Sequence, residues 1–367
     1  GGLGTSSKYW ASAYIDAITT TGDITVGGGI VGPATFEIIA QYTNRGRITL
    51  SSANSNDDSI QLSLLTAGTA TLNLTKGGAA NFTGVVTGTS FNGIPFFTDT
   101  TNNSMYTHDV SGTDDSAAQN TAYGFQALDA ITTGDDNTAI GFAAGGAITT
   151  GLYNIAIGSY AGDALVGGTK NVAIGYAALS TEDSYGKNVA IGYEALKVQD
   201  AAADAHNVAI GHQAGKAVTT GTENTIMGGL AGDALTTGNR NVAIGYDALG
   251  AEIRGDRNVA VGFDALGDQS NAGHVDVYNV AVGYDAGKAV TTGAKNTIIG
   301  GLAGDAIQDG SLNTVLGYDA GGGLTSASSS VLIGGFAGRA ITTGGGNVAV
   351  GYASLFTQGS NGSYSTA

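Results

Sequence analysis

One pentapeptide pattern, N-x-A-I-G, recurs along most of this chain and constrains its fold more than any other feature. Its first residue stands at fourteen places, which are 120, 137, 154, 171, 188, 207, 224, 241, 258, 279, 296, 313, 330 and 347. The spacing is 17 residues except for one step of 19 and one of 21, which mark insertions around 197–206 and 267–278. Such a fixed period is typical of a solenoid, in which each repeat adds one coil to a stack.

Residue types within the repeat predict how its chain runs. Position 1 is Asn in 13 of 14 repeats, as at Asn171 and Asn241, with Ser330 the exception. Position 2 is Val, Ile or Thr, position 3 is mostly Ala and position 4 is large and mainly aliphatic. This pattern predicts a short strand that points positions 2 and 4 to one face. Position 5 is Gly in all 14 repeats, including Gly175 and Gly245, which indicates a conformation or a close approach that a Cβ would forbid.

A large side chain follows the invariant glycine. Position 6 is aromatic in nine repeats, as at Tyr176 and Tyr246. Where position 6 shrinks, position 7 becomes large instead, in the pairs Ser159 and Tyr160, Gly229 and Leu230, Gly301 and Leu302, and Gly335 and Phe336. This exchange predicts a group that fills a defined space rather than decorating a surface. A second apolar-then-Thr segment, such as 130–133, often follows and ends at Gly.

Each repeat is therefore predicted to form two short strands joined by two tight corners, because such short segments with glycine at the corners do not suit helices. We predict an all-β chain, a parallel β-solenoid or β-roll of 17-residue coils preceded by a β-rich fibre shaft. Stacked Asn side chains would form an amide ladder. Coils about 4.8 Å apart would give a rod of roughly 65–70 Å. Because so small a coil encloses a thin apolar layer, we expect chains to share apolar faces, and we favour a homotrimer.

The first 119 residues lack the repeat but have a similar composition. Apolar residues there alternate with small or polar ones beside glycines, which predicts short strands. The chain is divided into a β-rich shaft at 1–97, a connector at 98–119, the fourteen-coil repeat domain at 120–363 and a tail at 364–367.

Composition and charge exclude several classes of protein. Glycine makes up 62 of the 367 residues but has no three-residue period, which excludes collagen, and the 42% hydrophobic content argues against disorder. The net charge of −16 disfavours nucleic acid and anionic membranes as partners. No apolar run is long enough to span a membrane, and the absence of cysteine removes disulfides and thiolate metal sites. Because Gly1 is not an initiator methionine, we expect a processed product or part of a longer chain.

The repeat motif resembles two related groups of fibrous proteins. The nonapeptide Asn-Val-Ala-Ile-Gly-Tyr-Ala-Ala-Leu at 171–179 and its copies resemble the head repeats of trimeric autotransporter adhesins, which form left-handed parallel β-rolls. The chain is more similar to bacteriophage tail fibres, because 9–22 and 88–93 resemble their shaft segments and such fibres often carry an N-x-A-I-G-x-x-A-L array. The resemblance implies a trimeric fibre with a structural role. The 17-residue period departs from the shorter repeat of adhesin heads.

The two insertions are the candidate binding loops. A solenoid places extra residues on an exposed flank, and loops on rigid scaffolds often carry recognition. We predict that the insertions protrude and contact a receptor through their polar residues, which are Lys197, Gln199, Asp200, Asp204, His206, Asp268, Gln269, Asn271, His274 and Asp276. The alternative is a pair of tolerated surface loops.

Acidic residues recur at position 7, as at Asp247, and at position 10, as at Asp129. Stacked carboxylates could bind calcium, whereas the other interpretation is a solvated turn face. The calcium-loop signatures GGxGxD and DxDxDG do not occur, so we expect no cofactor, and calcium is the alternative. No single coil gathers a distinctive acidic cluster for glycan hydrolysis, so we expect no enzymatic activity. The Thr-Thr pairs are interrupted too often to form an ice-binding grid.

We therefore expect a non-enzymatic structural fibre of a virion, extracellular, that gives a phage reach and attaches it to the host cell surface. Its expected partners are further copies of the chain in a homotrimer, other virion tail proteins, and a glycan or protein receptor on the host. Neither nucleic acid nor membrane insertion is expected. The alternative is an adhesin or filament subunit at the bacterial cell surface, and the third interpretation is a tailspike-type polysaccharide depolymerase.

Overall fold

The computed structural model describes residues 90–91, 94–95, 97–99, 104–107, 116–357 and 363–367. The chain divides into two compact units, Gly1–Thr83 and Gly84–Ala367. The first unit, and with it most of the predicted shaft, lies outside the described residues. In the second unit the described residues form strands and turns and no helix, beginning with an antiparallel pair of β1 (Ser90–Phe91) and β2 (Ile94–Pro95).

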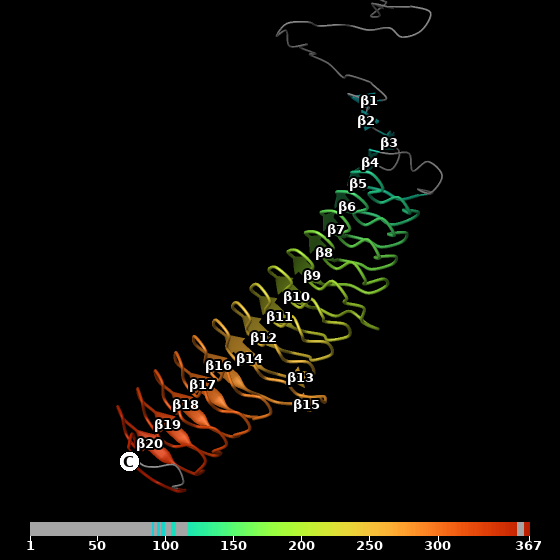
Figure 1. The fold of residues 1–367 in the computed structure, drawn as a ribbon. Coiled ribbons are helices and arrows are strands. Elements are labelled where there is room, and N and C mark those ends of the chain that lie inside the picture. The colour runs from blue at the N-terminus through green and yellow to red at the C-terminus, as the bar shows by residue number, and fades with distance from the viewer. Residues whose placement is uncertain (1–89, 92–93, 96, 100–103, 108–115, 358–362) are drawn as a thin grey trace, which may run out of the picture. The chain divides into compact units, whose positions relative to one another are not determined.

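Sixteen strands form one sheet, and fourteen of them come from the fourteen predicted coils (Figure 1). Each occupies positions 2–4 of its repeat and pairs in parallel with the strands of the neighbouring coils, so that Val172 lies opposite Val189. These strands are β5 (Thr121–Tyr123), β6 (Thr138–Ile140), β7 (Ile155–Ile157), β8 (Val172–Ile174), β9 (Val189–Ile191), β10 (Val208–Ile210), β11 (Thr225–Met227), β12 (Val242–Ile244), β14 (Val259–Val261), β16 (Val280–Val282), β17 (Thr297–Ile299), β18 (Thr314–Leu316), β19 (Val331–Ile333) and β20 (Val348–Val350). The predicted all-β parallel solenoid with about 17 residues per turn is confirmed.

The sheet extends beyond the fourteen coils at both ends. β4 (Ser104–Tyr106) pairs in parallel with β5, and β3 (Phe97–Asp99) pairs antiparallel with β4. At the other end Thr366 forms a parallel bridge to Val348. Residues of the predicted connector and of the predicted tail therefore add partial coils to the stack.

Among the described residues, twelve of the fourteen coils contain a single strand and two contain a second one, so the prediction of a second strand in every repeat is wrong. In the first coil the backbone N–H groups of Thr132, Thr133 and Gly134 all donate to the carbonyl oxygen of Thr149, at 3.0, 3.1 and 3.1 Å. Three donors that converge on one acceptor bend the chain, whereas a strand would spread them over successive carbonyls. This side of each coil is a column of turns that still forms hydrogen bonds from coil to coil.

The interior of each coil is filled from one chain. Position 3, as at Ala173, is buried in every coil, and position 8, as at Ala178, is buried in every coil but the last, where Ser354 is half-buried. A larger apolar side chain joins them from position 9 or position 12, as Leu179 and Ile148 do. The interior therefore closes within a single chain, and any contact between chains has to use the outside of the coils.

The sheet turns positions 2 and 4 to the outside. They share one face, as predicted, but the small residue between them is the one that points inward. In β17, Thr297 and Ile299 are exposed while Ile298 is buried. Position 4 is Ile, Val, Leu, Met or Tyr in all fourteen coils. The outer face of the sheet is consequently apolar from β5 to β20.

The Asn side chains of position 1 form the predicted ladder, and it lies in the interior. The backbone N–H of Asn241 donates to Oδ1 of Asn224 at 2.9 Å, and Nδ2 of Asn241 donates to the carbonyl oxygen of Gly255 at 2.9 Å. The backbone N–H of Asn171 likewise donates to Oδ1 of Asn154 at 3.0 Å. These buried amides thus pair backbone groups that would otherwise have no partner.

Position 5 requires glycine for two reasons. Gly175 and Gly245 have φ values of 129° and 136°, which L side chains rarely adopt. A Cβ on either residue would also overlap the carbonyl oxygen of the glycine one coil further on, Gly192 or Gly262. The prediction of a special conformation and a close approach is confirmed in both parts.

The aromatic side chains of position 6 stack along the outside of the coils. Tyr176 and Tyr246 are 47% and 50% exposed, so the prediction that they avoid the surface is wrong. The ring of Tyr176 lies nearly parallel to that of Tyr193, with centroids 5.3 Å apart. Tyr160, at position 7, meets Phe142 and Tyr176 edge-on at 5.2 and 6.1 Å. At Tyr160 and Phe336 the exchange between positions 6 and 7 thus continues a column of rings on the surface, whereas Leu230 and Leu302 interrupt it.

Candidate functional site

The two coils with insertions, 188–206 and 258–278, interrupt the otherwise regular surface. In the second of them β15 (Val275–Asp276) pairs in parallel with β13 (Gly255–Asp256) of the preceding coil. This small sheet lies on the side of the stack away from the main sheet (Figure 1). The second insertion therefore belongs to the turn side and leaves the apolar sheet face unobstructed.

Seven of the ten predicted contact residues lie at least partly on the surface. Five are exposed, namely Asp200, His206, Asp268, His274 and Asp276. Lys197 and Asp204 are half-buried and form ion pairs. Lys197 Nζ lies 2.6 Å from Glu194 Oε1, and Asp204 Oδ2 lies 2.5 Å from Lys187 Nζ.

The other three residues, Gln199, Gln269 and Asn271, are buried, so the prediction that they contact a receptor is wrong. Gln199 and Gln269 occupy position 12, where nine coils carry a buried Ile, Leu or Val. Oε1 of Gln199 accepts a hydrogen bond from Asn207 Nδ2, and Oε1 of Gln269 accepts one from Asn279 Nδ2, both at 2.8 Å. The glutamines therefore fix each enlarged coil to the Asn ladder.

Each buried glutamine follows a buried glutamate at position 12 of the preceding coil, Glu182 before Gln199 and Glu252 before Gln269. These glutamates escaped the sequence analysis because they stand in polar segments typical of surface turns. The sequence does, however, contain a sign that position 12 is different in these coils. In all four of these coils position 9 is Leu, so the interior apolar group moves from position 12 to position 9.

Glu252 is saturated with hydrogen bonds. Its Oε1 accepts the backbone N–H groups of the three following residues at 2.7–2.9 Å. Its Oε2 accepts the side-chain amides of Gln269 at 2.7 Å and Asn271 at 2.8 Å. A buried carboxylate that accepts this many donors is compensated for its loss of water.

Glu182 has a poorer set of partners. Its Oε1 accepts the backbone N–H of Tyr185 at 3.3 Å, and its Oε2 is buried without a hydrogen-bond partner among the described residues. Burial raises the pKa of the Glu182 carboxyl from 4.5 to about 7. Backbone hydrogen bonds from Tyr185 and Ala201 oppose the rise, and the nearby carboxylates of Asp200 and Asp183 add to it. The folded chain therefore favours the neutral form of this side chain.

We expect Glu182 to make the chain less stable as pH rises in metal-free buffer. Between pH 4.5 and about 7 the folded state holds the carboxyl proton more tightly than the unfolded state does, so the free energy of unfolding falls over this window. The loss amounts to roughly 3 kcal/mol by linkage. Thermal unfolding of the wild type and of Glu182→Gln between pH 4 and 8 measures it. Identical pH profiles for the two proteins would contradict this account.

Three of the five carboxylates at position 7, those of Glu194, Asp264 and Asp319, form ion pairs. Lys197 and Lys216 lie 2.6 and 2.7 Å from Glu194, and their hydrogen bonds, with one from Gln213, lower the pKa of that carboxyl to about 2. Further pairs of this kind join Asp264 to Lys288 and Asp319 to Arg339. Within the described coils, the group of three acidic side chains close enough to hold a metal is at positions 12 and 13 instead, and consists of Glu182, Asp183 and Asp200.

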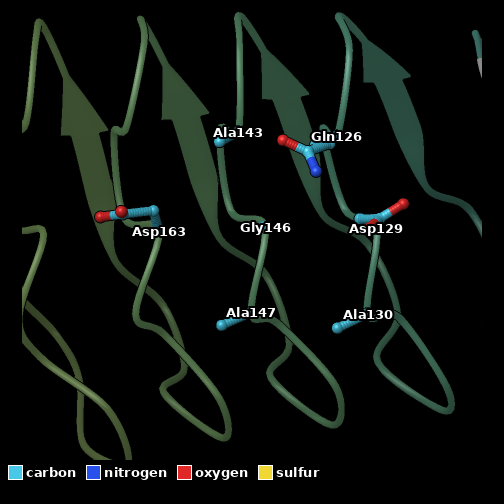
Figure 2. Close-up of a pocket in the computed structure, with 7 residues that line it drawn as sticks. All are labelled: Gln126, Asp129, Ala130, Ala143, Gly146, Ala147 and Asp163. Carbon is cyan, nitrogen blue, oxygen red and sulfur yellow. The ribbon is translucent and has the colours of Figure 1, made fainter.

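A shallow hollow of about 380 Å³ lies among the first three coils, also on the turn side (Figure 2). It forms because Gly146 stands at position 10 between two coils that carry Asp there, Asp129 and Asp163. The two aspartate side chains point in opposite directions, away from each other (Figure 2). Three of the seven residues that line the hollow are alanine, and its two aspartates point apart, so it does not bring a pair of carboxylates together (Figure 2).

Comparisons with protein-family models, curated proteins and solved structures gave no match. Among the residues that the structure describes, no helix has the length and apolar character of a membrane span.

Proposed function

We propose that this chain is the structural subunit of a homotrimeric fibre, a bacteriophage tail fibre that reaches to the host cell surface and attaches there. The observation that carries the proposal is the outer face of the sheet. Position 4 is apolar and position 2 is β-branched and uncharged in every one of the fourteen coils. Side chains of this face, such as Ile299 and Leu316, are 37% and 42% exposed in the single chain.

An apolar surface of this length normally marks a contact with another protein. Strands repeat about every 4.8 Å along it, so the surface fits best against a partner with the same spacing. A second and a third copy of this chain have that spacing. Three stacks closed around one axis would cover all three faces, and the resemblance to trimeric fibres favours this number over two.

Attachment is assigned to the exposed parts of the two insertions. His206, His274 and Asp276 are exposed on coils that are otherwise held rigidly by in-register hydrogen bonds. A rigid stack that carries polar loops suits recognition of a glycan or protein at a distance from the virion. Other tail proteins of the virion are the proposed partners for joining the fibre to the particle.

Immunogold electron microscopy tests this function. Antibodies raised against the purified chain should label the tail fibres of the phage that encodes it, and the purified chain should slow adsorption of that phage to its host. Labelling of the surface of a bacterium instead would support the alternative, an adhesin or filament subunit, and would overturn the phage assignment. Release of reducing sugars from host polysaccharide by the purified chain would overturn the non-enzymatic role and favour a depolymerase.

A further inference from the structure

The chain contains two versions of the same unusual feature, a buried glutamate at position 12 in the coil before an insertion. Both carboxylate oxygens of Glu252 accept hydrogen bonds, which compensate for its burial. Glu182 is also fully buried, yet its Oε2 has no hydrogen-bond partner within the described part of the chain. We call the site around Glu252 the complete site. The site around Glu182 is the incomplete site, because among the described residues it lacks a partner for one oxygen of a buried carboxylate.

Two further carboxylates lie next to the incomplete one. One oxygen of each of Glu182, Asp183 and Asp200 lies within 4.8 Å of one oxygen of each of the others. Glu182 is buried, whereas Asp183 and Asp200 are exposed. None of the ion pairs between described residues involves these three side chains. Three close carboxylates without a cation repel one another.

Comparison of equivalent positions shows that the acids belong to the incomplete site alone. At the place of Asp183 the complete site has Ile253, and at the place of Asp200 it has Ser270. The complete site has Asn271 instead, whose backbone and side chain both donate to Glu252, at 3.2 and 2.8 Å. Glu252 is thus compensated by side-chain amides as well as backbone N–H groups. Within the described part of the chain, Glu182 has only the backbone N–H groups of Tyr185 and Ala201 as donors, and two further carboxylates lie beside it.

We propose that Glu182, Asp183 and Asp200 bind one calcium ion. Calcium takes six to eight oxygen ligands in irregular geometry and accepts carboxylates together with water. The cluster offers oxygen ligands with neither His nor Cys, which disfavours zinc. Nε2 of Gln199 is buried without a partner among the described residues, and the equivalent atom of the complete site, Nε2 of Gln269, donates to Glu252 Oε2 at 2.7 Å. The ion would tie Asp200 in the first insertion to the coil before it.

Isothermal titration of the full, chelator-treated chain with CaCl2 tests the site. We expect one saturable site per chain with a dissociation constant on the order of 0.1 mM, as in extracellular calcium modules. Asp200→Asn and Asp183→Asn should each weaken binding at least tenfold. Both side chains are exposed, so both variants should keep the circular dichroism spectrum of the wild type. Asp268→Asn, which removes an exposed aspartate from the other insertion, should bind calcium as the wild type does.

Two results would overturn the proposal. The first is the absence of saturable calcium binding, or equal binding by the wild type and Asp200→Asn. The second is a crystal structure grown with calcium in which Oε2 of Glu182 contacts a water molecule alone, with no ion at 2.3–2.6 Å from the three carboxylates. The site does not rest on the proposed fibre function, since the proposed contact between chains uses the outer face of the main sheet and none of these three carboxylates lies in a strand of that sheet.

Discussion

Replacing Gly245 by Val will prevent the coils around it from stacking. At φ of 136° a valine is strained, and its Cβ would overlap the carbonyl oxygen of Gly262 in the next coil. No side chain can move to relieve the overlap, because the obstructing atom belongs to the backbone. We expect a loss of about 4 kcal/mol or more in local stability. Hydrogen exchange followed by mass spectrometry should show coils 228–275 exchanging at rates near those of the unfolded chain.

Gly273→Val provides the matched control. Gly273 lies in the second insertion, and a Cβ on it would have no atom within 4 Å. The same substitution there should leave exchange in the coils unchanged. Equal exchange in the two variants, whether both slow or both fast, would show that position 5 has no special need for glycine.

Replacing Asn224 by Leu will break the interior ladder. Its Oδ1 accepts the backbone N–H of Asn241 at 2.9 Å, and its Nδ2 donates to the carbonyl oxygen of Gly238 at 2.9 Å. Without the amide both backbone groups stay buried and unpaired, at a cost of about 1–3 kcal/mol each. We expect a local loss of roughly 3–5 kcal/mol. Exchange of the Asn241 amide proton, followed by NMR or mass spectrometry, measures it directly.

Serine offers the conservative comparison, because the chain already uses it in one coil. The backbone N–H of Ser330 donates to Oδ1 of Asn313 at 3.1 Å, and its Oγ accepts the backbone N–H of Asn347 at 3.3 Å. Asn224→Ser should therefore keep much of the protection that Asn224→Leu loses. If the Asn241 amide exchanges as slowly in Asn224→Leu as in Asn224→Ser, the side chain at position 1 does not stabilise the coils through its hydrogen bonds.

The features that the sequence predicted are those in which one repeat position has one physical task. Position 1 has to pair backbone groups of two coils and position 5 has to admit a neighbouring carbonyl, so Asn and Gly recur there almost without exception. Strand β8 and its copies follow in the same way from the alternation around Ala173. Because each of these positions needs one residue type, the requirement is visible when the repeats of a single sequence are aligned.

The features that the sequence did not predict depend on the width of the coil and on hydrogen-bond partners in neighbouring coils. Apolar residues at positions 2 and 4 suggest an interior, yet the coil is so narrow that it encloses the alanine between them. The Thr-rich segment around Thr132 suits a strand, but its donors converge on the carbonyl of Thr149. Gln199 and Gln269 look like surface residues, and their burial follows from partners one coil away that no local pattern reveals.

We propose that other copies of the chain cover the outer face of the sheet. Leu316 lies on that face, and Val166 lies on the turn side; both are 42% exposed. Leu316→Arg would place a charge in the trimer interface without disturbing the interior of its own coil, whereas Val166→Arg would leave the interface intact. The pair separates the proposed contact from a general effect of added charge.

Sedimentation equilibrium of the purified chain measures this claim most directly. We predict a mass of three times the 36.2 kDa of one chain for the wild type and for Val166→Arg, and a shift toward the single-chain mass for Leu316→Arg at micromolar concentration. A stable, folded wild-type monomer with its sheet face exposed to water would contradict the account.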